Sequence, residues 1–390
     1  MEDSLRKEKT KGNEKMKQFS KPKVLAMYLP QFHETPENNQ FWGKGFTDWH
    51  SVKHAESYFE GHVQPKVPLD ENYYDLSDPS VIKQQAILAR NYGIDGFCIY
   101  HYWFENDKKV LYKPAEILLA NPEIDINYCF MWDNNSWIRS WSKIDGNAWA
   151  PAYEKPAKEE NDYLLKVEYG SCSQWKKHFE YLLPFFMDRR YIKIDNKPVF
   201  GFFSTKNGNE LKQMGEYWEK LAVEHGFSGM YLISRNDPFI QKNIFQTEFI
   251  YQPAASAWQR YDAIVKRLKK YFPVKKKMQK PTCYDYDKVW GKILLESKVK
   301  AHKNVLLCGF VNYDDTPRRG VNGKVIVGGN SEKFGKYFEK LYQLSYKYQK
   351  DILFLMAWNE WGEGAYLEPD QKDKLSYLQE IERVVKRIRR

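Results

Sequence analysis

The stretch Ile352-Leu-Phe-Leu-Met-Ala-Trp-Asn-Glu-Trp-Gly-Glu363 joins six apolar residues directly to a polar and aromatic sequence. A short, continuous apolar run is typical of a strand that is buried on both faces of a parallel sheet. Polar groups that begin where such a strand ends suit the floor of a pocket. Two carboxylates, Glu360 and Glu363, occupy this position beside Trp358 and Trp361. An acid and a base against aromatic walls are what the chemistry of glycosidic bonds needs.

Seven more runs of β-branched and aromatic residues occur along the chain, and helical patterns separate them. The eight predicted strands are residues 24–29, 94–100, 126–131, 198–203, 230–233, 245–251, 305–311 and 352–357. The predicted helices are residues 79–92, 113–119, 173–187, 210–225, 256–272, 286–300, 331–348 and 375–390. This alternation predicts an α/β fold, a single (β/α)8 barrel of the TIM type with long βα loops.

The helix predicted at residues 79–92 has the clearest boundaries. Asp78 can cap its N-terminus, Pro79 suits the first helical position, and Gly93 lies just past its end. The capping residues therefore agree with the apolar spacing of the segment.

In a (β/α)8 barrel the active site is built where the strands end and the βα loops begin. The residues that follow the predicted strands are polar or aromatic, which predicts one polar cleft at that end of the barrel. They are Gln31, His33, His101, Tyr102, Trp103, Trp132, Asp133, Asn134, Arg235, Asn236, Asp237, Gln252 and residues 312–315 and 358–363.

The aromatic content supports a sugar-binding cleft. Aromatic residues make up 16% of the 390 residues, with 13 Trp and 28 Tyr. Flat aromatic side chains stack on the apolar faces of sugar rings, although most of them also serve as ordinary core residues. We expect one catalytic barrel domain at residues 24–390, preceded by a disordered basic tail at residues 1–23.

The net charge of +10 is concentrated in three segments. Residues 1–23 carry a net charge of +4, residues 266–280 carry +8, and residues 380–390 carry +3, so the remaining chain is net −5. A basic fringe around a mildly acidic body argues against a nucleic-acid groove. It fits a solvated surface, or peripheral contact with an anionic membrane.

Cysteine use and hydropathy indicate a cytoplasmic protein. The chain has five Cys, an odd number, and Cys98, Cys129 and Cys308 lie in apolar runs, which is typical of buried thiols. The first 23 residues are charged throughout, and no run of 18 apolar residues occurs. We expect no cofactor, because two carboxylates suffice for glycosidic bond chemistry. His33, His50 and His54 lack a carboxylate at metal-motif spacing, so we expect no zinc site.

Five motifs, in this order, resemble the WbsX-like family, which is named for glycosyltransferases of bacterial surface polysaccharide clusters. They are Tyr28-Leu-Pro-Gln-Phe-His33, Trp42-Gly-Lys-Gly-Phe-Thr-Asp-Trp49, Gly93-Ile-Asp-Gly-Phe-Cys-Ile-Tyr-His-Tyr-Trp-Phe104, Asp315-Thr-Pro-Arg-Arg319 and Trp358-Asn-Glu-Trp-Gly-Glu-Gly-Ala-Tyr-Leu-Glu-Pro369. The resemblance covers about residues 24–382. This family shares its fold and its last motif with the family 99 glycoside hydrolases, which are endo-acting α-mannosidases.

The resemblance implies a role for each of the two carboxylates. Glu360 matches the residue that takes the proton of the substrate's own 2-hydroxyl group, which closes on the anomeric carbon to give a 1,2-anhydro sugar. Glu363 matches the residue that protonates the departing oxygen and later activates water. Aromatic neighbours would raise the pKa of a carboxyl group toward the value that a general acid needs.

The chain departs from the family pattern at several positions. Asn135 replaces a common Glu, with Asp133 as a neighbouring acid, and Asp48 replaces another Glu. The pair Asp314-Asp315 stands where an Asp-Asn pair is usual, and Gly362 stands where the mannosidases have a His. The identity of the sugar is therefore open.

Two other functions fit the same residues. Asp285-Tyr-Asp287 could hold the metal and diphosphate of a nucleotide sugar, but it also opens a predicted helix, where Asp is favoured as a cap. Arg318 or Arg319 could hold a phosphate or a uronic acid carboxylate, or form surface salt bridges. A glycosyltransferase acting on a nucleotide-linked or lipid-linked sugar is thus one alternative. A catalytically silent glycan-binding protein is the other.

The expected site has Glu360 and Glu363 as catalytic residues. The expected substrate-binding residues are Trp42, Trp49, His101, Tyr102, Trp103, Trp132, Asn134, Trp137, Asp314, Asp315, Arg318, Asn359 and Trp361. The expected partner is an oligosaccharide or polysaccharide, which a lipid carrier could present at the inner face of the cytoplasmic membrane.

Overall fold

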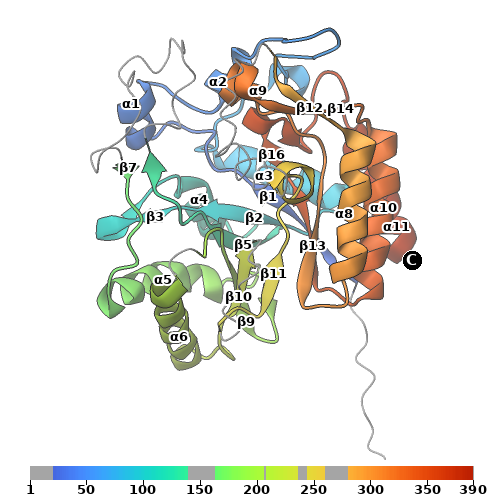
Figure 1. Cartoon of the computed structure of the whole chain (residues 1–390). Helices are drawn as coiled ribbons and strands as arrows, with labels where there is room; N and C mark the ends of the chain where they lie inside the picture. Colours follow the sequence, from blue (N-terminus) through green and yellow to red (C-terminus); the bar gives the residue numbers. More distant parts are fainter. Residues whose placement is uncertain (1–20, 139–162, 206–207, 236–243, 260–279, 390) are drawn as a thin grey trace, which may run out of the picture.

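The structure is a computed structural model, and it describes residues 21–138, 163–205, 208–235, 244–259 and 280–389. Its centre is a barrel of eight parallel strands (Figure 1). In barrel order the strands are β1 (Lys23–Tyr28), β2 (Gly96–His101), β5 (Asn127–Trp132), β9 (Lys197–Phe202), β10 (Tyr231–Arg235), β11 (Thr247–Phe249), β13 (Val305–Phe310) and β15 (Ile352–Met356).

Two pairings close the barrel. The last strand, β15, pairs in parallel with β1, so that Leu25 lies opposite Phe354. The pairing of β9 with β10 completes the ring. Each of the eight predicted apolar runs overlaps one of these strands, which confirms the predicted (β/α)8 barrel. Both faces of the strands are covered, as the almost continuous burial of β2, β13 and β15 shows.

Helices form the outer layer (Figure 1). They are α3 (Pro79–Asn91), α4 (Lys113–Ala120), α5 (Cys172–Met187), α6 (Gly208–Glu224), α8 (Tyr286–Lys300), α10 (Ser331–Lys347) and α11 (Ser376–Arg389). All seven overlap predicted helices. The predicted helix at residues 256–272 overlaps a short π-helix, η6 (Ala255–Gln259), and its remainder lies outside the described residues.

Side-chain caps define where several helices begin. The carboxylate of Asp78 accepts a hydrogen bond from the backbone N–H of Ser80 at the start of α3, as its capping position predicts. Ser171 and Gln174 form a reciprocal capping box at the start of α5. Asn330 caps α10 by accepting from the backbone N–H of Lys333.

Long loops follow the strands and carry small elements of their own. The loop after β1 holds α1 (Pro36–Trp42), α2 (Trp49–Lys53) and η1 (Leu69–Glu71). The loop after β13 holds α9 (Thr316–Arg319), η7 (Gly320–Asn322) and β14 (Lys324–Val327), which pairs with β12 (Thr282–Asp285). After β15 come β16 (Asn359–Glu360), η8 (Trp361–Glu363) and β17 (Ala365–Tyr366). Figure 1 shows α2 and α9 side by side at the top of the barrel, and these two elements are in contact.

Smaller strands complete the loops and one edge. They are β3 (Trp103–Phe104) with β4 (Lys108–Lys109), β6 (Trp137–Ile138) with β7 (Tyr163–Leu165), and β8 (Lys193–Ile194), which is antiparallel to β9. Within the described ranges, no helix is long and apolar enough to cross a lipid bilayer. Residues 1–20 of the predicted tail and residues 266–279 of the predicted basic segment lie outside the described part of the chain.

Candidate active site

One guanidinium group holds three carboxylates at the mouth of the barrel. Arg318 Nη2 donates to Glu360 Oε1 at 2.6 Å and to Asp48 Oδ2 at 2.8 Å. Arg318 Nη1 donates to Glu363 Oε1 at 3.2 Å. Because both glutamates contact the same planar cation, they face a common space. The two catalytic candidates are thus brought together by an Arg and an Asp that are far from them in the sequence.

The elements that carry these groups come from three different βα loops. Glu360 ends β16 and Glu363 ends η8, directly after the eighth barrel strand. Arg318 belongs to α9, and Asp48 precedes α2. The backbone also joins two of the loops, because the N–H of Asp314 donates to the carbonyl of Glu363 at 2.6 Å.

Gly362 makes this arrangement possible. A Cβ atom at this position would lie 2.5 Å from Arg318 Nε and 2.8 Å from Asp48 Oδ2, which is closer than atoms can approach. The guanidinium therefore packs against bare backbone between the two glutamates. Gly364 follows with a left-handed conformation (φ +57°), which suits glycine and turns the chain into β17.

The two glutamates differ in burial. The Glu360 side chain is 5% exposed, whereas that of Glu363 is 23% exposed. Burial raises the pKa of Glu360 to about 8, although the positive charge of Arg318 acts in the opposite direction. Burial also raises the pKa of Glu363, again against the effect of Arg318. A site with raised carboxyl pKa values holds a proton near neutral pH, as acid and base chemistry requires.

Four tyrosines surround the carboxylates. Burial raises the pKa of Tyr100 and Tyr102, and the nearby charge of Glu360 adds to this effect. Burial likewise raises the pKa of Tyr251 and Tyr313, and Glu363 is the largest charged contributor for both. The hydroxyls of Tyr100 and Tyr251 are 3.3 Å apart. These phenols remain neutral and present aromatic faces and hydroxyl groups to the same space as the glutamates.

A second acid lies near this ring of tyrosines. Burial raises the pKa of Asp133, and its carboxylate accepts a 2.7 Å hydrogen bond from Asn135 Nδ2. Arg235 is close enough to lower that pKa, and its guanidinium stacks 3.5 Å from the centre of the Phe203 ring. Asp133 therefore provides an acid next to the position where the family commonly has Glu. Asn236 and Asp237 lie outside the described residues.

The family model described as Glycosyltransferase WbsX matches residues 24–381. The chain belongs to this WbsX family. The expectation from its five motifs is thereby confirmed.

The chain is also similar to curated proteins and to solved structures. The chain is 27% identical over 369 residues to the uncharacterized protein WxcX from Xanthomonas campestris pv. campestris. That match covers 91% of this chain and 48% of the relative, so the chain spans about half the length of the curated relatives it matches. The GH99 endo-alpha-mannosidase from Bacteroides thetaiotaomicron superimposes with a TM-score of 0.54 at 13% identity, covering 94% of this chain and 97% of the mannosidase. A glycoside hydrolase-like protein gives 0.55 at 12% identity, covering 94% and 95%. At these identities the likeness shows the shared barrel fold.

Three predicted residues from the WbsX motifs lie behind the glutamates and hold them in place. Asn359 is fully buried, and its amide donates to the carbonyl of Leu29 at 3.0 Å and accepts from the N–H of Leu29 at 2.7 Å. Trp361 donates from Nε1 to Glu368 Oε2 at 2.7 Å, and its ring packs against Trp49. These contacts fix the backbone on both sides of Glu360, so we assign Asn359, Trp49 and Trp361 to the framework of the site.

Glu368 is the centre of this framework. Its carboxyl group accepts hydrogen bonds from Tyr74 Oη, Gln85 Nε2 and Trp361 Nε1, each at 2.7 Å. Burial raises its pKa to about 7, despite these three donors. Glu368 lies in the last of the five motifs, but the sequence did not indicate its role, because its partners come from three separate segments of the chain.

Side chains at the end of one strand alternate between the mouth and the helix layer. His101 points toward the helices and hydrogen-bonds through Nε2 to His178 Nε2 of α5 at 2.7 Å. Burial lowers the pKa of His101 to about 3, so this ring is neutral. Trp103 stacks on the same His178 ring with centroids 4.3 Å apart. Trp132 meets it edge-on at 4.9 Å. The structure therefore places His101, Trp103 and Trp132 in an aromatic cluster outside the barrel wall.

Asn134 joins the ends of two strands. It accepts from the N–H of Ser204 at 2.7 Å and donates to the carbonyl of Ser204 at 2.6 Å, which ties the loop after β5 to the loop after β9. Trp137 meets Tyr102 edge-on at 5.6 Å, and Trp42 meets Trp137 at 5.8 Å. Trp42 is half-buried, so this aromatic row leads from the tyrosines toward the rim.

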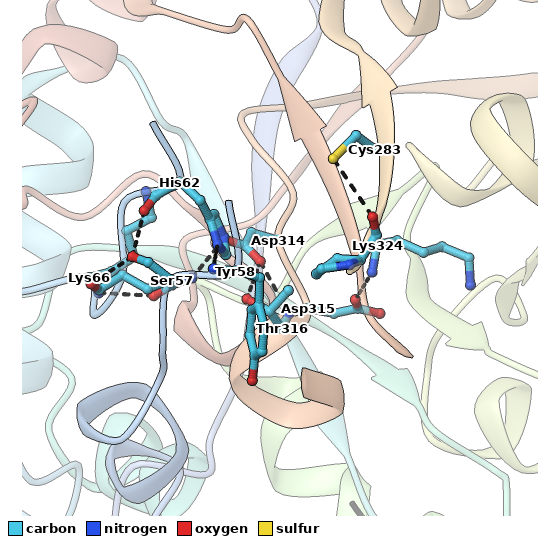
Figure 2. Close-up of polar contacts among 11 residues, drawn as sticks. Ser57, Tyr58, His62, Lys66, Cys283, Asp314, Asp315, Thr316 and Lys324 are labelled. Atoms are coloured by element: carbon cyan, nitrogen blue, oxygen red, sulfur yellow. Dashed lines mark hydrogen bonds and ion pairs between the residues drawn. The ribbon is translucent and has the colours of Figure 1, made fainter. Parts of the chain in front are cut away.

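The two predicted aspartates after β13 form internal contacts. Asp314 accepts from His62 Nε2 at 2.8 Å and from Gln64 Nε2 at 2.6 Å (Figure 2). Asp315 accepts from the backbone N–H of Lys324 at 2.5 Å and pairs with Arg319. They stabilise the loop that carries Arg318, whose own side chain reaches the glutamates.

Both aspartates of the Asp-x-Asp motif make structural contacts within the protein. Asp285 caps α8 by accepting from the backbone N–H of Lys288 at 2.8 Å. Asp287 pairs with Lys333 at 2.7 Å and accepts from Tyr337 Oη at 2.8 Å. The helix-cap interpretation of this motif is confirmed for Asp285. Among the residues that the structure describes, no group of three or more His, Cys, Asp or Glu side chains is arranged to hold a metal ion.

Proposed function

We propose that this chain is a carbohydrate-active enzyme of bacterial surface polysaccharide metabolism. It cleaves or transfers an α-glycosidic, mannoside-like bond through Glu360 and Glu363. The single observation that carries the proposal is the contact of both carboxylates with the guanidinium of Arg318 at the barrel mouth. Membership of the WbsX family and the barrel shared with an endo-alpha-mannosidase support the same class of substrate.

The proposed reaction uses the two carboxylates in turn. Glu360 accepts the proton of the sugar's 2-hydroxyl group while that oxygen bonds to the anomeric carbon. The bond from the anomeric carbon to the leaving oxygen breaks, and Glu363 protonates that oxygen. Water or a sugar hydroxyl then attacks the anomeric carbon of the 1,2-anhydro sugar and gives its proton to Glu363. The 2-oxygen recovers its proton from Glu360, so both carboxyl groups return to their starting states.

The geometry supports the division of roles in one respect. Glu363 is the more exposed carboxyl group, so it is the one that a leaving group and an incoming water can both reach. Glu360 is more deeply buried and contacts the cation at the shorter distance. Arg318 favours the ionised form that a base needs, but burial raises the pKa of Glu360 to about 8, so this base is ionised mainly above that pH. Tyr102 and Trp137 form a buried aromatic row that ends at Trp42, and the half-buried Trp42 is the member of this row that can stack on a further sugar unit.

Substitution of each glutamate tests the roles separately. Purified surface polysaccharide is first screened for new reducing ends, and the sugar so identified is prepared as its α-glycosyl fluoride. Glu360→Gln is expected to lose turnover of both substrates by at least 10²-fold, because the base is needed in the first step whatever the leaving group. Glu363→Gln is expected to lose turnover of the polysaccharide but to release fluoride in a burst, because fluoride departs without a proton.

Both Gln variants keep the shape of the side chain, and their melting temperatures are compared with that of the wild type. Full turnover of the polysaccharide by either variant would contradict the proposal. Binding of the glycan without turnover by the wild-type protein would instead favour the silent glycan-binding protein.

The family description favours transfer to a sugar acceptor as a second candidate function. A mixture of polysaccharide and a labelled acceptor sugar separates the two reactions. Incorporation of the acceptor in place of new reducing ends identifies a transferase that uses the same two carboxylates. Product formation only with a nucleotide sugar and a divalent metal would instead identify a nucleotide-sugar glycosyltransferase.

We further propose that the glycan is presented on a lipid at the cytoplasmic face of a membrane. The basic residues in the last turn of α11 form ion pairs with acidic residues of the same chain, Lys386 with Glu382, Arg387 with Glu339 and Arg389 with Asp95. The basic segment 266–280 and the basic end at residues 386–390 would contact anionic lipid. Flotation with anionic vesicles is expected to carry the protein into the lipid fraction at low salt. Protein that stays entirely in the soluble fraction would end this proposal.

A further inference from the structure

A cavity borders the loops that carry Asp314 and Gly364, and its lining does not include the two glutamates. Its volume is about 150 Å³, and it is lined by segments 59–66, 312–314, 325–329 and 364–374. One water molecule needs about 10–15 Å³ on this measure, so the cavity has room for a ligand of several heavy atoms. Asp314 and Gly364 form part of the wall, and each neighbours a residue of the active-site loops. Figure 2 labels three of the lining residues, His62, Lys66 and Asp314.

Two acidic side chains of the cavity wall, Asp314 and Asp370, already accept hydrogen bonds within the protein. Asp314 accepts hydrogen bonds from His62, Gln64 and Thr316, at 2.8, 2.6 and 2.6 Å. Asp370 accepts from Tyr366 Oη at 2.6 Å and from the backbone N–H of Asp373 at 2.5 Å. Their lone pairs are thus engaged from within.

The lysine side chains of the cavity wall differ from these acids in their hydrogen bonding. Lys66 Nζ, Lys372 Nζ and Lys374 Nζ form no hydrogen bond or ion pair with any residue in the described ranges. Lys66 is half-buried, and burial lowers its pKa, with the charge of Lys372 adding to this effect. Asp314, Asp370 and Asp373 act on Lys66 only through longer-range attraction. A partly desolvated ammonium group without a hydrogen-bonded acceptor is a site for an anionic oxygen.

Uncharged polar groups and open backbone complete the wall. Asn312 donates from Nδ2 to Tyr377 Oη at 2.9 Å, which leaves its carbonyl oxygen as an acceptor at the cavity. Gly328, with φ +86° and open space around it, exposes its backbone there. Ile326 and Tyr313 supply apolar surface. Charged, polar and apolar groups in one concave site suit a sugar ring that carries a carboxylate.

We propose that this cavity is a second carbohydrate site that binds an acidic sugar unit, with the sugar's carboxylate on Lys66 and a hydroxyl group on Asn312. The site goes beyond the proposed function, because none of its binding groups belongs to the catalytic pair. It gives the protein a means of recognising an acidic glycan apart from the bond that it cleaves or transfers.

Binding of uronic acid oligosaccharides tests the proposal. Calorimetry is performed with an acidic oligosaccharide, with its neutral counterpart that has the same linkages, and with inorganic phosphate. The wild-type protein is expected to bind the acidic form at least tenfold more tightly than the neutral form. Lys66→Gln is expected to lose at least tenfold in affinity for the acidic form. Glu363→Gln is expected to bind it as the wild type does.

The matched control is Lys372→Gln, which removes an exposed ammonium group at the rim and is expected to change the affinity by less than about threefold. Equal binding by Lys66→Gln and the wild type would overturn the proposal, as would loss of binding in Glu363→Gln. Phosphate that binds as tightly as the acidic sugar, and depends on Lys66, would overturn the assignment to a sugar.

A measurement on the wild-type protein keeps the test valid if Lys66→Gln does not fold. Addition of the acidic oligosaccharide is expected to shift the backbone amide resonances of Gly328 and Gly329. Shifts confined to residues around Glu360 would place the ligand in the active site and overturn the proposal. These experiments measure binding and not turnover. Their outcome therefore does not depend on whether the proposed catalytic function is correct.

Discussion

A single positive charge, on Arg318, serves three carboxylates at the proposed active site. If Asp48, Glu360 and Glu363 were all ionised, the cluster would carry two uncompensated negative charges in a largely buried place. Such a cluster favours the uptake of a proton, in line with the raised pKa of both glutamates. Arg318 therefore sets how strongly that proton is held, in addition to setting where the side chains lie.

Removal of this cation has an expected effect on the pH dependence of turnover. In Arg318→Gln the pKa of Glu360 rises further, because Arg318 is the group that lowers it. The limb of the rate profile that requires ionised Glu360 is then expected to move to higher pH by about one unit or more. The measurement is kcat/KM from pH 5 to pH 10.

Arg318→Lys is the matched control, because it keeps the positive charge and removes the planar fork. It is expected to lower kcat/KM with a smaller movement of that limb. An unchanged pH profile in Arg318→Gln would show that Arg318 has only a structural role.

Sequence alone predicted the two glutamates and Arg318 as site residues, because they lie in short motifs at strand ends. It did not show which side of a strand end each neighbour faces. Tyr100 and Tyr102 reach the mouth, while His101 between them faces α5. Side chains along a strand point alternately to its two faces. Continuing this alternation past the end of β2 would have predicted that Tyr100 and Tyr102 face the mouth and that His101 faces the helices.

At the scale of elements, the helices and strands were predictable because each has local signals. Capping residues such as Asp78 and buried apolar runs such as residues 305–311 act over a few neighbouring residues. The contact between Arg318 and Asp48 joins residues 270 positions apart, and it depends on how two irregular loops fold over the barrel. No local pattern determines such a contact. For the same reason, the sequence did not predict that Glu368 holds the framework of the site together.

The start of α8 provides a prediction at this scale. Asp285→Ala removes the side-chain acceptor for the N–H of Lys288 and is expected to lower the free energy of unfolding by about 1 kcal/mol. The measurement is urea denaturation at equilibrium. Asp285→Asn keeps an acceptor for the cap and is expected to retain most of the stability.

Binding of a nucleotide sugar with a divalent cation is measured on the same Asp285 variants. The substitutions are expected to leave any such binding unchanged, because the carboxylate is used by the helix. Loss of metal-dependent nucleotide binding without a change in stability would restore the Asp-x-Asp motif as a transferase site.

At the scale of the whole molecule, buried acids link stability to pH. The pKa values of Glu368 and Glu360 are raised from 4.5 to about 7 and about 8. A raised value in the folded state means that the protonated group favours folding. This contribution is complete below about pH 4.5 and is lost as the pH rises through 7 and 8. The free energy of unfolding of the wild-type protein is therefore expected to fall as the pH rises from about 4.5 to about 8.

Glu368→Gln isolates one of these groups. The variant cannot ionise at this position, so its unfolding free energy is expected to fall by about 2 to 3 kcal/mol less than that of the wild type between pH 5 and pH 8.5. The measurement is denaturant unfolding of both proteins at the two pH values. Parallel pH dependence of wild type and variant would contradict the raised pKa of Glu368.

The pairing of β1 with β15 also affects how the protein is made. Leu25 and Phe354 are partners in the barrel, yet more than 300 residues of chain are synthesised between them. Glu360 and Glu363 emerge from the ribosome only after this last barrel strand. A growing chain therefore has neither a closed barrel nor its proposed catalytic pair until translation has passed them, and open sheet edges make such intermediates prone to aggregation. The order of the strands alone therefore keeps the proposed active site incomplete until the end of the barrel has been synthesised.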